Sequence, residues 1–156
     1  MSAPPSALSS AMPSIDVVNA RPFLSIALAT YNGERYIGEQ LDSILHQTRL
    51  PDELVVSDDA SVDSTQAIVL DFARRASFPV RFQANGARLG STGNFEMAIR
   101  ACGGDIIFLC DQDDVWYPDK IALIEERFIN DPGTGLVFTD ADVVDQDLRP
   151  LKLRLW

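Results

Sequence analysis

Three aspartates follow directly after an apolar run in the second half of the chain. The run Ile106–Cys110 reads as a buried strand, and its exit is crowded by Asp111, Asp113 and Asp114. Carboxylates held this close raise each other's pKa unless a cation or hydrogen-bond donors offset their charge. A hard divalent ion such as Mg²⁺, which takes substrate phosphates in its remaining coordination positions, is the usual solution. The spacing therefore predicts a metal-assisted site for a nucleoside diphosphate.

The elements that must position these carboxylates are short apolar runs alternating with helical periods. Strands are expected at Leu24–Ala29, Glu53–Ser57, Val80–Gln83, Ile106–Cys110 and Gly135–Thr139. Helical apolar stripes lie between or after them, around Ile37–Leu45, Ile68–Ala73, Phe95–Cys102 and Ile121–Phe128. This β-α-β-α repetition predicts an α/β fold with a mostly parallel, Rossmann-like sheet and helices on both faces.

Polar residues cluster at the ends of three of the expected strands. Residues 30–34 follow the first strand, Asp58 and Asp59 follow the second, and residues 111–114 follow the fourth. In open parallel sheets, ligands bind at the carboxyl ends of the strands. Surface charge placed at random would not be expected to recur at the ends of three strands. The sequence therefore predicts one nucleotide pocket at the carboxyl ends of the strands.

Some of these residues also have purely structural interpretations. Asp58 and Asp59 could be no more than a strand exit and a helix cap, since aspartate favours both roles. A carboxylate there could instead accept a hydrogen bond from the imide N–H of a uracil or thymine ring. Tyr31 could pack against the core or form a flat wall for that ring.

Two further segments near the expected site favour a structural interpretation. Residues 85–94 are glycine-rich but lack the G-x-G-x-x-G and G-K-[ST] patterns of phosphate-binding loops. A flexible turn is therefore expected there, with a solvated Arg88. Trp116 and Tyr117 are expected to form a packing plug rather than a platform for a sugar.

Composition narrows the class of protein. The chain has 156 residues, of which 46% are hydrophobic, and this suits one domain with a core of ordinary size. Its formal net charge of −10 argues against a nucleic-acid partner, because nucleic-acid phosphates require a basic face. No apolar run approaches the roughly 18–20 residues of a membrane span. Residues 1–20 are rich in Ala, Ser and Pro without the features of a signal peptide, and a flexible leader is expected there.

Four motifs, in the right order, resemble the family 2 glycosyltransferases of the GT-A fold. They read LSIALATYNGE (24–34), LDSILHQT (41–48), VVSDDASVDST (55–65) and CDQDDVWYPDK (110–120). The resemblance extends from about residue 22 to residue 147, which is far more specific than any single motif. The sequence DQDDVW is similar to the bacterial branch described as rhamnosyltransferases of cell-surface polysaccharide assembly.

The resemblance implies a nucleotide-sugar donor site built from the three strand ends. Thr30 and Tyr31 would line the nucleoside, with Glu34 close by, and Asp59 would hold a pyrimidine base. Asp111 would face the ribose.

The resemblance also implies a divalent cation, Mg²⁺ or Mn²⁺, at the donor diphosphate. Asp113 would be its ligand, with Asp111 in the same D-x-D element and Asp114 sharing the ion or lying just behind it. The reaction implied is transfer of a sugar from a UDP- or dTDP-linked donor to a saccharide or lipid-linked saccharide acceptor, with inversion. The location implied is cytoplasmic, with peripheral association at the inner face of the membrane left open.

The chain departs from the family pattern in its length. Residues 21–156 are expected to form the donor-binding portion only, without the C-terminal acceptor part and the carboxylate that would act as general base. Asp140 and Asp142 lie where the acceptor region begins, and neither is assigned as that base. Apolar residues in 148–156 would lack their usual cover and could favour self-association into a homo-oligomer.

Two rival functions fit parts of the sequence. A truncated, non-catalytic module that binds a nucleotide sugar and acts by association stays open, because the base is the feature that separates an enzyme from a binder. A phosphoacceptor receiver domain shares the acidic strand ends and Mg²⁺ but needs a lone aspartate and a strand-ending lysine. The run 111–114 matches it poorly, and no strand-ending lysine occurs before Lys152.

Overall fold

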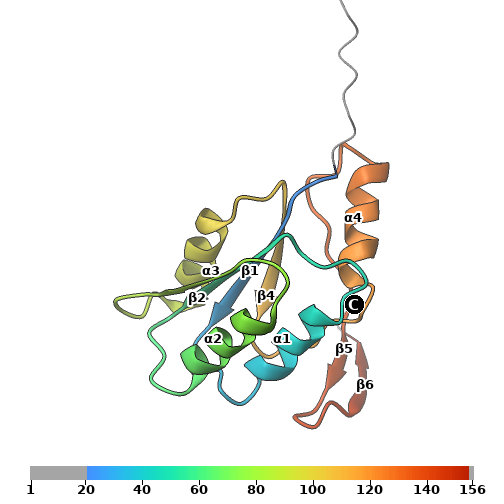
Figure 1. Cartoon of the computed structure of the whole chain (residues 1–156). Helices are drawn as coiled ribbons and strands as arrows, with labels where there is room; N and C mark the ends of the chain where they lie inside the picture. The colour runs from blue at the N-terminus through green and yellow to red at the C-terminus, as the bar shows by residue number, and fades with distance from the viewer. Residues whose placement is uncertain (1–20, 155–156) are drawn as a thin grey trace, which may run out of the picture.

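The computed structural model describes residues 21–154, and within this range the chain forms six strands and four helices (Figure 1). The strands are β1 (Leu24–Thr30), β2 (Glu53–Asp58), β3 (Val80–Ala84), β4 (Ile106–Asp111), β5 (Asp142–Val144) and β6 (Pro150–Arg154). The helices are α1 (Ile37–Leu45), α2 (Thr65–Arg75), α3 (Gly90–Ala101) and α4 (Lys120–Asn130). The predicted leader, residues 1–20, lies outside the described residues.

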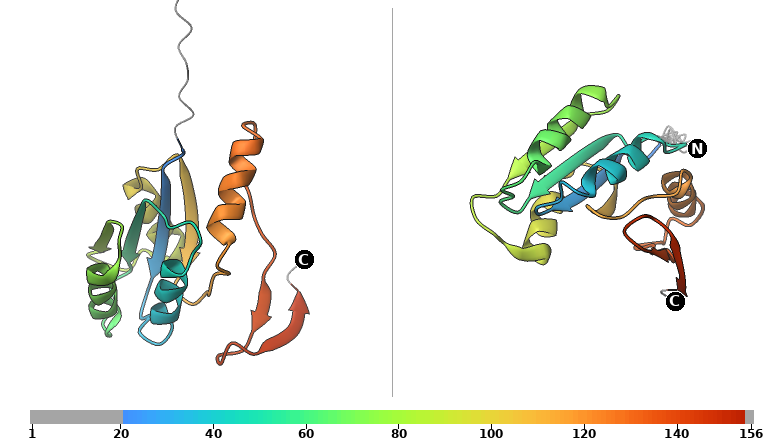
Figure 2. Two further views of the ribbon diagram at one scale, coloured as in Figure 1. Left: turned by 45° about the vertical axis from the view of Figure 1, so that its right-hand side comes forward. Right: turned by 90° about the horizontal axis from the view of Figure 1, so that it is seen from below.

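The main sheet has the order β3-β2-β1-β4, and every neighbouring pair is parallel. Helix α3 packs on β1 and β2, while α1 and α2 pack on each other across the opposite face (Figure 2). Strand β1 is central, and all seven of its residues are buried. Both faces are therefore covered over the middle of the sheet, as a parallel sheet requires. The predicted α/β fold with helices on both faces is confirmed.

The first four strands and the four helices occur at the places where the apolar periodicity predicts them, but α3 begins at Gly90, five residues before the predicted stripe. Residues 90–94, which were expected to belong to a flexible turn, are therefore helical. The core lies on the α1–α2 face, where Ile26, Leu28 and Leu54 are fully buried against Ile37 and Phe72. On β4 the side chains that face this core, such as Phe108, are buried, while Leu109 on the other face is 57% exposed. Helix α3 packs mainly on β1 and β2, so it covers this face of β4 less well.

The predicted fifth strand at Gly135–Thr139 is wrong. Residues 135–139 form no strand, and Leu136 is 79% exposed. An apolar run becomes a strand only where another strand pairs with it, and β4 pairs only with β1 within the described residues. The strand after α4 is instead β5, which pairs antiparallel with β6.

The β5–β6 hairpin is closed by one aspartate. The Asp145 carboxylate accepts hydrogen bonds from the backbone N–H groups of Asp147 and Arg149, at 2.9 and 3.0 Å. The backbone N–H of Asp145 also donates to the Arg149 carbonyl. Turns in which the side chain accepts hydrogen bonds from the following backbone are typical of aspartate. This one reverses the chain within a few residues.

Helix α4 is held near the N-terminal ends of β1 and β2 by ion pairs to its buried Glu125. The Glu125 side chain is 5% exposed and accepts a bidentate pair of hydrogen bonds from Arg21, at 2.8 and 2.7 Å, with Arg49 at 3.3 Å. Burial alone would raise the pKa of Glu125, but the two arginines lower it below its ordinary value. These contacts lie at the start of β1, so the carboxyl ends of the strands, at the opposite end of the sheet, are left for ligands.

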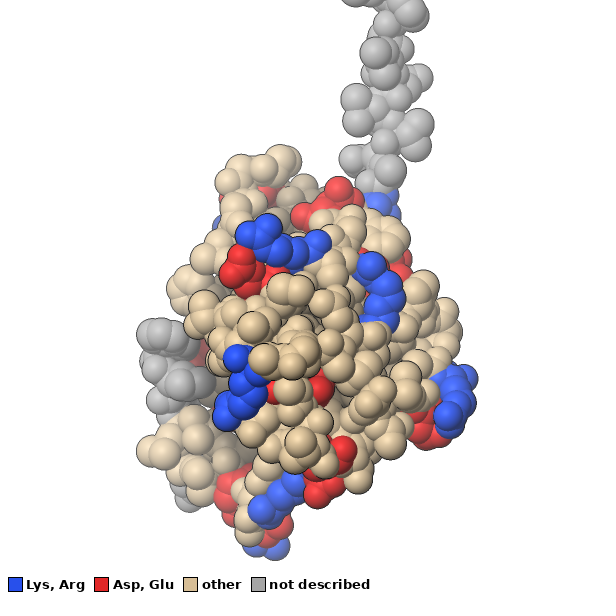
Figure 3. Space-filling view, turned by 90° about the vertical axis from the view of Figure 1, so that its left-hand side faces the viewer, with Lys and Arg blue, Asp and Glu red and all other residues tan. Residues whose placement is uncertain are grey.

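The surface has no dominant basic region on the face shown in Figure 3, where acidic and basic side chains are interspersed. Among the described residues, no helix has the length and apolar character needed to cross a bilayer.

Candidate functional site

The loops that follow β1 and β2 interlock at the carboxyl edge of the sheet. Their hydrogen bonds run in both directions, from Asn32 N to Ser61 Oγ (2.8 Å), Gly33 N to Thr65 Oγ1 (2.8 Å), Glu34 N to Asp63 Oδ2 (3.0 Å) and Ser64 N to Glu34 Oε2 (3.0 Å). The predicted donor residue Glu34 thus uses one carboxylate oxygen to hold the start of α2. These bonds fix the β1 exit before any ligand binds.

Gln112 joins the acidic loop after β4 to the end of β1. Its Oε1 accepts from Thr30 Oγ1 at 2.6 Å and from the Tyr31 N–H at 2.8 Å, and its Nε2 donates to the Tyr31 carbonyl at 3.2 Å. Gly33 makes this contact possible, because a Cβ on residue 33 would lie 2.3 Å from Gln112 Oε1. No role for Gln112 was predicted from the sequence. The sequence did contain one indication of this role: Gln112 lies between Asp111 and Asp113, and Gly33 lies in the segment that follows the first strand.

Asp59 is buried, and the loop before α3 holds its carboxylate. Its two oxygens accept from the backbone N–H groups of Leu89 and Gly90, at 2.6 and 2.9 Å. Burial alone would raise the pKa of Asp59, but these N–H groups lower it. Gly90 has φ +76°, a left-handed conformation that glycine adopts without steric cost. Asp59 therefore caps the start of α3, while Asp58 accepts from Ser61.

Arg88 connects the Asp59 side of the site to Tyr31. Its guanidinium carbon lies 3.8 Å from the centre of the Tyr31 ring, and its Nε lies 3.8 Å from Asp59 Oδ2. The Arg88 side chain is 60% exposed, as expected of a solvated arginine, but it also contacts Tyr31 and Asp59, which the sequence did not indicate. A planar cation thus occupies the aromatic face that a nucleobase would need, on a side chain exposed enough to move.

We expect Asp59→Asn to lower the free energy of unfolding by about 1–3 kcal/mol, which denaturant unfolding would measure. An amide has only one oxygen, so its NH₂ would face one of the two backbone N–H donors and leave that donor unsatisfied. The matched control is Asp71→Asn on α2, where the carboxylate is 63% exposed and paired only with surface arginines. Equal losses in the two variants would contradict the capping role.

The three predicted metal-site carboxylates lie together at the exit of β4. Burial raises the pKa of Asp111, and the charges of Asp114 and Asp113 raise it further. The pKa of Asp114 is also raised, by burial first, with Lys120 acting in the opposite direction. These carboxylates therefore feel one another's charge, which a bound cation would offset.

No group of three ligating side chains is already arranged as a metal cage within residues 21–154. The donor set still fits Mg²⁺ or Mn²⁺, because all three side chains offer carboxylate oxygens. Mg²⁺ in particular is usually held by one or two protein carboxylates, with waters and substrate phosphates completing the shell. Asp113 and its neighbours fit this open kind of site better than one in which protein side chains supply every ligand.

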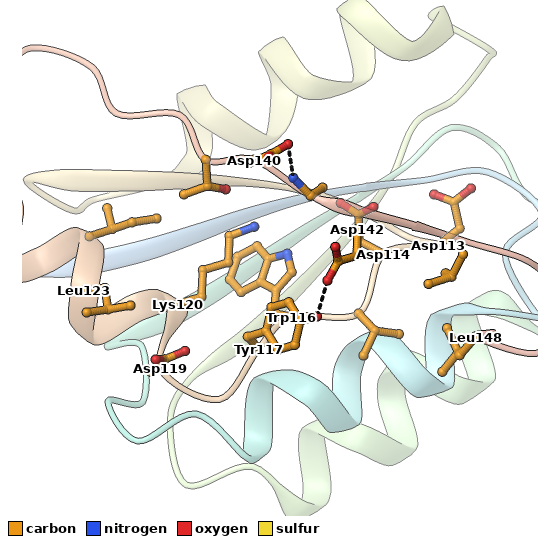
Figure 4. A pocket seen from close by; sticks show the side chains of 15 residues that line it. Asp113, Asp114, Trp116, Tyr117, Asp119, Lys120, Leu123, Asp140, Asp142 and Leu148 are labelled. Atoms are coloured by element: carbon orange, nitrogen blue, oxygen red, sulfur yellow. Dashed lines mark hydrogen bonds between the residues drawn. The ribbon is translucent and has the colours of Figure 1, made fainter. Parts of the chain in front are cut away.

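A cavity of about 450 Å³ opens beside the acidic loop, between α4 and the β5–β6 hairpin (Figure 4). Its lining includes Asp113 and Asp114 together with Trp116, Tyr117 and residues of α4. Trp116 is 5% exposed and packs on Phe108 at 6.0 Å between ring centres, which agrees with the packing plug. Tyr117 is instead 64% exposed, and its hydroxyl donates to Asp142 at 2.6 Å.

The structure thus brings the predicted residues into one continuous set of contacts. Arg88 contacts both Asp59 and the ring of Tyr31. The backbone N–H of Tyr31 in turn donates to Gln112, which lies in the acidic loop. The backbone N–H of Asp59 also donates to the Thr30 carbonyl at 2.8 Å, so the ends of β1 and β2 touch directly.

With this geometry in place, comparison with known families identifies the class of protein. The chain belongs to glycosyl transferase family 2, whose family model matches residues 25–155. Its similarity to a glycosyltransferase of Nostoc sp. is 32% identity over 124 residues, covering 78% of this chain and 37% of that protein. The dTDP-rhamnosyl transferase RfbG of Shigella flexneri is 39% identical over 100 residues, covering 60% of this chain and 34% of RfbG. The chain therefore spans little more than a third of the length of these curated relatives.

Solved structures share the fold. The mannosyltransferase PcManGT of Pyrobaculum calidifontis, in complex with GDP-Man and Mn²⁺, matches with a TM-score of 0.64 and 28% identity, covering 81% of this chain and 37% of that one. TarS 1–349 of S. aureus, in complex with UDP, matches with a TM-score of 0.64 and 23% identity, covering 78% and 41%. The predicted GT-A fold is confirmed.

Proposed function

We propose that this chain is the donor-binding portion of a glycosyltransferase that uses a UDP- or dTDP-linked sugar and a divalent cation. The observation that carries the proposal is the unbroken contact from Asp59 through Tyr31 and Gln112 to the acidic loop. It brings a carboxylate able to receive a base N–H and a carboxylate cluster able to hold a cation to the same sheet edge. A nucleoside diphosphate has these two chemical ends.

Each predicted donor residue has a role in this proposal. Tyr31 stacks on the base once Arg88 moves aside, and Asp59 accepts from the imide N–H, since a carboxylate has lone pairs beyond those used by residues 89 and 90. Thr30 and Glu34 line the nucleoside. Asp111 faces the ribose.

The cation would be held by Asp113, with Asp111 and Asp114 contributing charge or a ligand oxygen. When bound, such an ion neutralises the departing nucleoside diphosphate. The acceptor hydroxyl, giving its proton to a carboxylate base, would attack the anomeric carbon from the opposite face as the bond to the diphosphate oxygen breaks, giving inversion. Relatives and neighbours support this choice, since RfbG is named a dTDP-rhamnosyl transferase and the PcManGT complex contains Mn²⁺. We place the acceptor among saccharides or lipid-linked saccharides of cell-surface polysaccharide synthesis.

A second candidate is a nucleotide-sugar-binding module without catalytic activity. No described carboxylate is assigned as the general base, so donor binding and transfer are separate questions for this chain.

Donor binding is tested by thermal unfolding with UDP, dTDP or GDP, each with Mn²⁺ or with EDTA. A ligand that binds only the native state stabilises it, by about 2.7 kcal/mol at 100 times its Kd. For a chain of this size that corresponds to a rise in Tm of about 5–10 °C. We expect UDP or dTDP to give such a rise with Mn²⁺ and much less with EDTA. If no nucleotide raises the Tm above the value with Mn²⁺ alone, the proposal is wrong.

A further inference from the structure

Two asparagine–glycine pairs follow strands of the main sheet. Asn32 and Gly33 come after β1, and Asn85 and Gly86 come after β3. An asparagine followed by glycine is the dipeptide that loses its side-chain amide most readily in water. The backbone nitrogen of the glycine can attack the asparagine Cγ, because glycine has no side chain to hinder the approach. The two pairs differ in how firmly the structure holds that nitrogen.

The first pair is held on both sides. Gly33 is buried, and its backbone N–H donates to Thr65 Oγ1 at 2.8 Å. Asn32 Oδ1 accepts from the backbone N–H of Val62 at 3.0 Å, so the amide that would be attacked is fixed as well. Attack by the Gly33 nitrogen would break a buried hydrogen bond, which costs free energy. This pair should therefore react slowly while the chain is folded.

The second pair has a free attacking nitrogen. Gly86 is exposed, and within residues 21–154 no hydrogen bond is found from its backbone N–H. The partly buried Asn85 donates from Nδ2 to Asn94 Oδ1 at 3.0 Å and to Ser57 Oγ at 3.5 Å. These bonds slow the departure of the amide nitrogen, but they do not hold the nitrogen that attacks. The second pair is therefore the more reactive one in the folded chain.

The Asn85 amide supports the base side of the proposed nucleotide pocket. Asn94 is 2% exposed, accepts from Asn85, and donates from its own Nδ2 to the Thr30 carbonyl at 3.1 Å. Burial alone would raise the pKa of Asp59, and the backbone N–H groups of the loop before α3, together with the Asn85 amide, lower it. A carboxylate at position 85 offers no donor to Asn94. Asn94 cannot turn its amide around without presenting an oxygen to the Thr30 carbonyl.

We propose that Asn85 is a site of spontaneous deamidation, and that this modification weakens nucleotide binding. The Gly86 nitrogen forms a bond to Asn85 Cγ and the Cγ–Nδ2 bond breaks, so that Nδ2 leaves as ammonia with the proton that the Gly86 nitrogen gives up. Water then opens the five-membered imide at either carbonyl, which yields aspartate or isoaspartate at position 85. Both products add one negative charge beside Asp59. The effect on binding rests on the proposed function, whereas the modification itself does not.

Peptide mass spectrometry of the full chain, incubated at mildly alkaline pH and physiological temperature, measures the modification at both pairs. We expect Asn85 to be converted about tenfold faster than Asn32 in the folded chain, since the Gly33 nitrogen must first break its buried hydrogen bond. In denaturant the two rates should approach each other, because neither glycine is then held. Equal rates in the folded chain, or faster conversion of Asn32, would overturn the modification site.

Gly86→Ala separates chemical reactivity from structure. The added methyl meets no atom within 4 Å, and Gly86 lies outside the left-handed region, so the free energy of unfolding should stay nearly the same. The methyl hinders closure of the imide ring and should slow the conversion of Asn85 about tenfold. An unchanged rate in a variant of unchanged stability would show that the Gly86 nitrogen does not attack Asn85, and the proposal would be wrong.

The effect on the pocket is measured as the rise in Tm that UDP or dTDP produces with Mn²⁺. Incubated protein and freshly prepared Asn85→Asp should both bind about tenfold more weakly than the fresh chain, while incubated Gly86→Ala keeps the full rise. An Asn85→Asp protein that binds as tightly as the fresh chain overturns the effect on binding. If no nucleotide raises the Tm of the fresh chain, the proposed function and this effect both fail, and the mass spectra still decide whether Asn85 is modified.

Discussion

Asp113→Asn is expected to lower nucleotide affinity in Mn²⁺ by about two orders of magnitude, or roughly 2.8 kcal/mol, because the cation that would offset the diphosphate charge loses a carboxylate ligand. The amide removes the negative charge that attracts the cation but keeps the size of the side chain. The rise in Tm produced by UDP or dTDP with Mn²⁺ should fall to the level seen with EDTA. Isothermal calorimetry with and without the metal measures the same loss directly.

The control for this variant must remove one negative charge elsewhere. The chain carries a net charge of −10, so any such change reduces repulsion of an anionic ligand. Asp71→Asn does this on exposed α2, away from the carboxyl edge of the sheet, and should leave the Mn²⁺-dependent shift intact. An Asp113→Asn protein that keeps the full shift would remove Asp113 from the cation site.

Gly33→Ala and Gln112→Ala are expected to be strongly non-additive. Alanine at 33 would place a Cβ 2.3 Å from Gln112 Oε1 and 2.8 Å from Thr30 Oγ1, which displaces the Gln112 side chain from Tyr31. Each single change should cost about 1–3 kcal/mol of unfolding free energy, because a buried hydrogen-bonding partner is lost. The double variant should cost about 1–2 kcal/mol less than the sum, since most of the clash disappears with Gln112.

Denaturant unfolding of the four proteins gives the coupling energy. Gly38→Ala is the matched glycine control, because it lies in α1 with no atom within 4 Å of an added Cβ. It should be neutral or slightly stabilising, as alanine is the better helix former. Additive losses for Gly33→Ala and Gln112→Ala would show that Gln112 does not join the acidic loop to the β1 exit.

Apolar periodicity was enough to predict the main sheet, and the reason is its parallel architecture. Strands covered on both faces read as continuous apolar runs, as β1 does, and the helices between them keep a clear apolar stripe. The run at 135–139 shows the limit of this signal. Its Leu-Val-Phe composition suits a strand, yet strand formation depends on a neighbouring strand that local composition cannot reveal.

The site was predictable to the level of its strand ends and not beyond. The phase of polar residues after β1, β2 and β4 brought Thr30, Asp59 and the acidic loop to one edge because parallel strands end together. The roles of Gln112 and Arg88 depend on contacts between residues 29 to 82 positions apart, which no local pattern contains. The two structural interpretations considered from sequence apply to different aspartates: Asp58 ends β2, while Asp59 caps a helix, which is α3 rather than the adjacent α2.

The most direct measurement is a crystal structure of the chain grown with UDP or dTDP and Mn²⁺, with the ion located by its anomalous scattering. The ion is predicted at direct bonding distance from an Asp113 oxygen and from the diphosphate, with the base beside Tyr31 and Arg88 displaced from the ring. A nucleotide bound at another edge of the sheet, or an anomalous peak away from Asp113, would contradict the account.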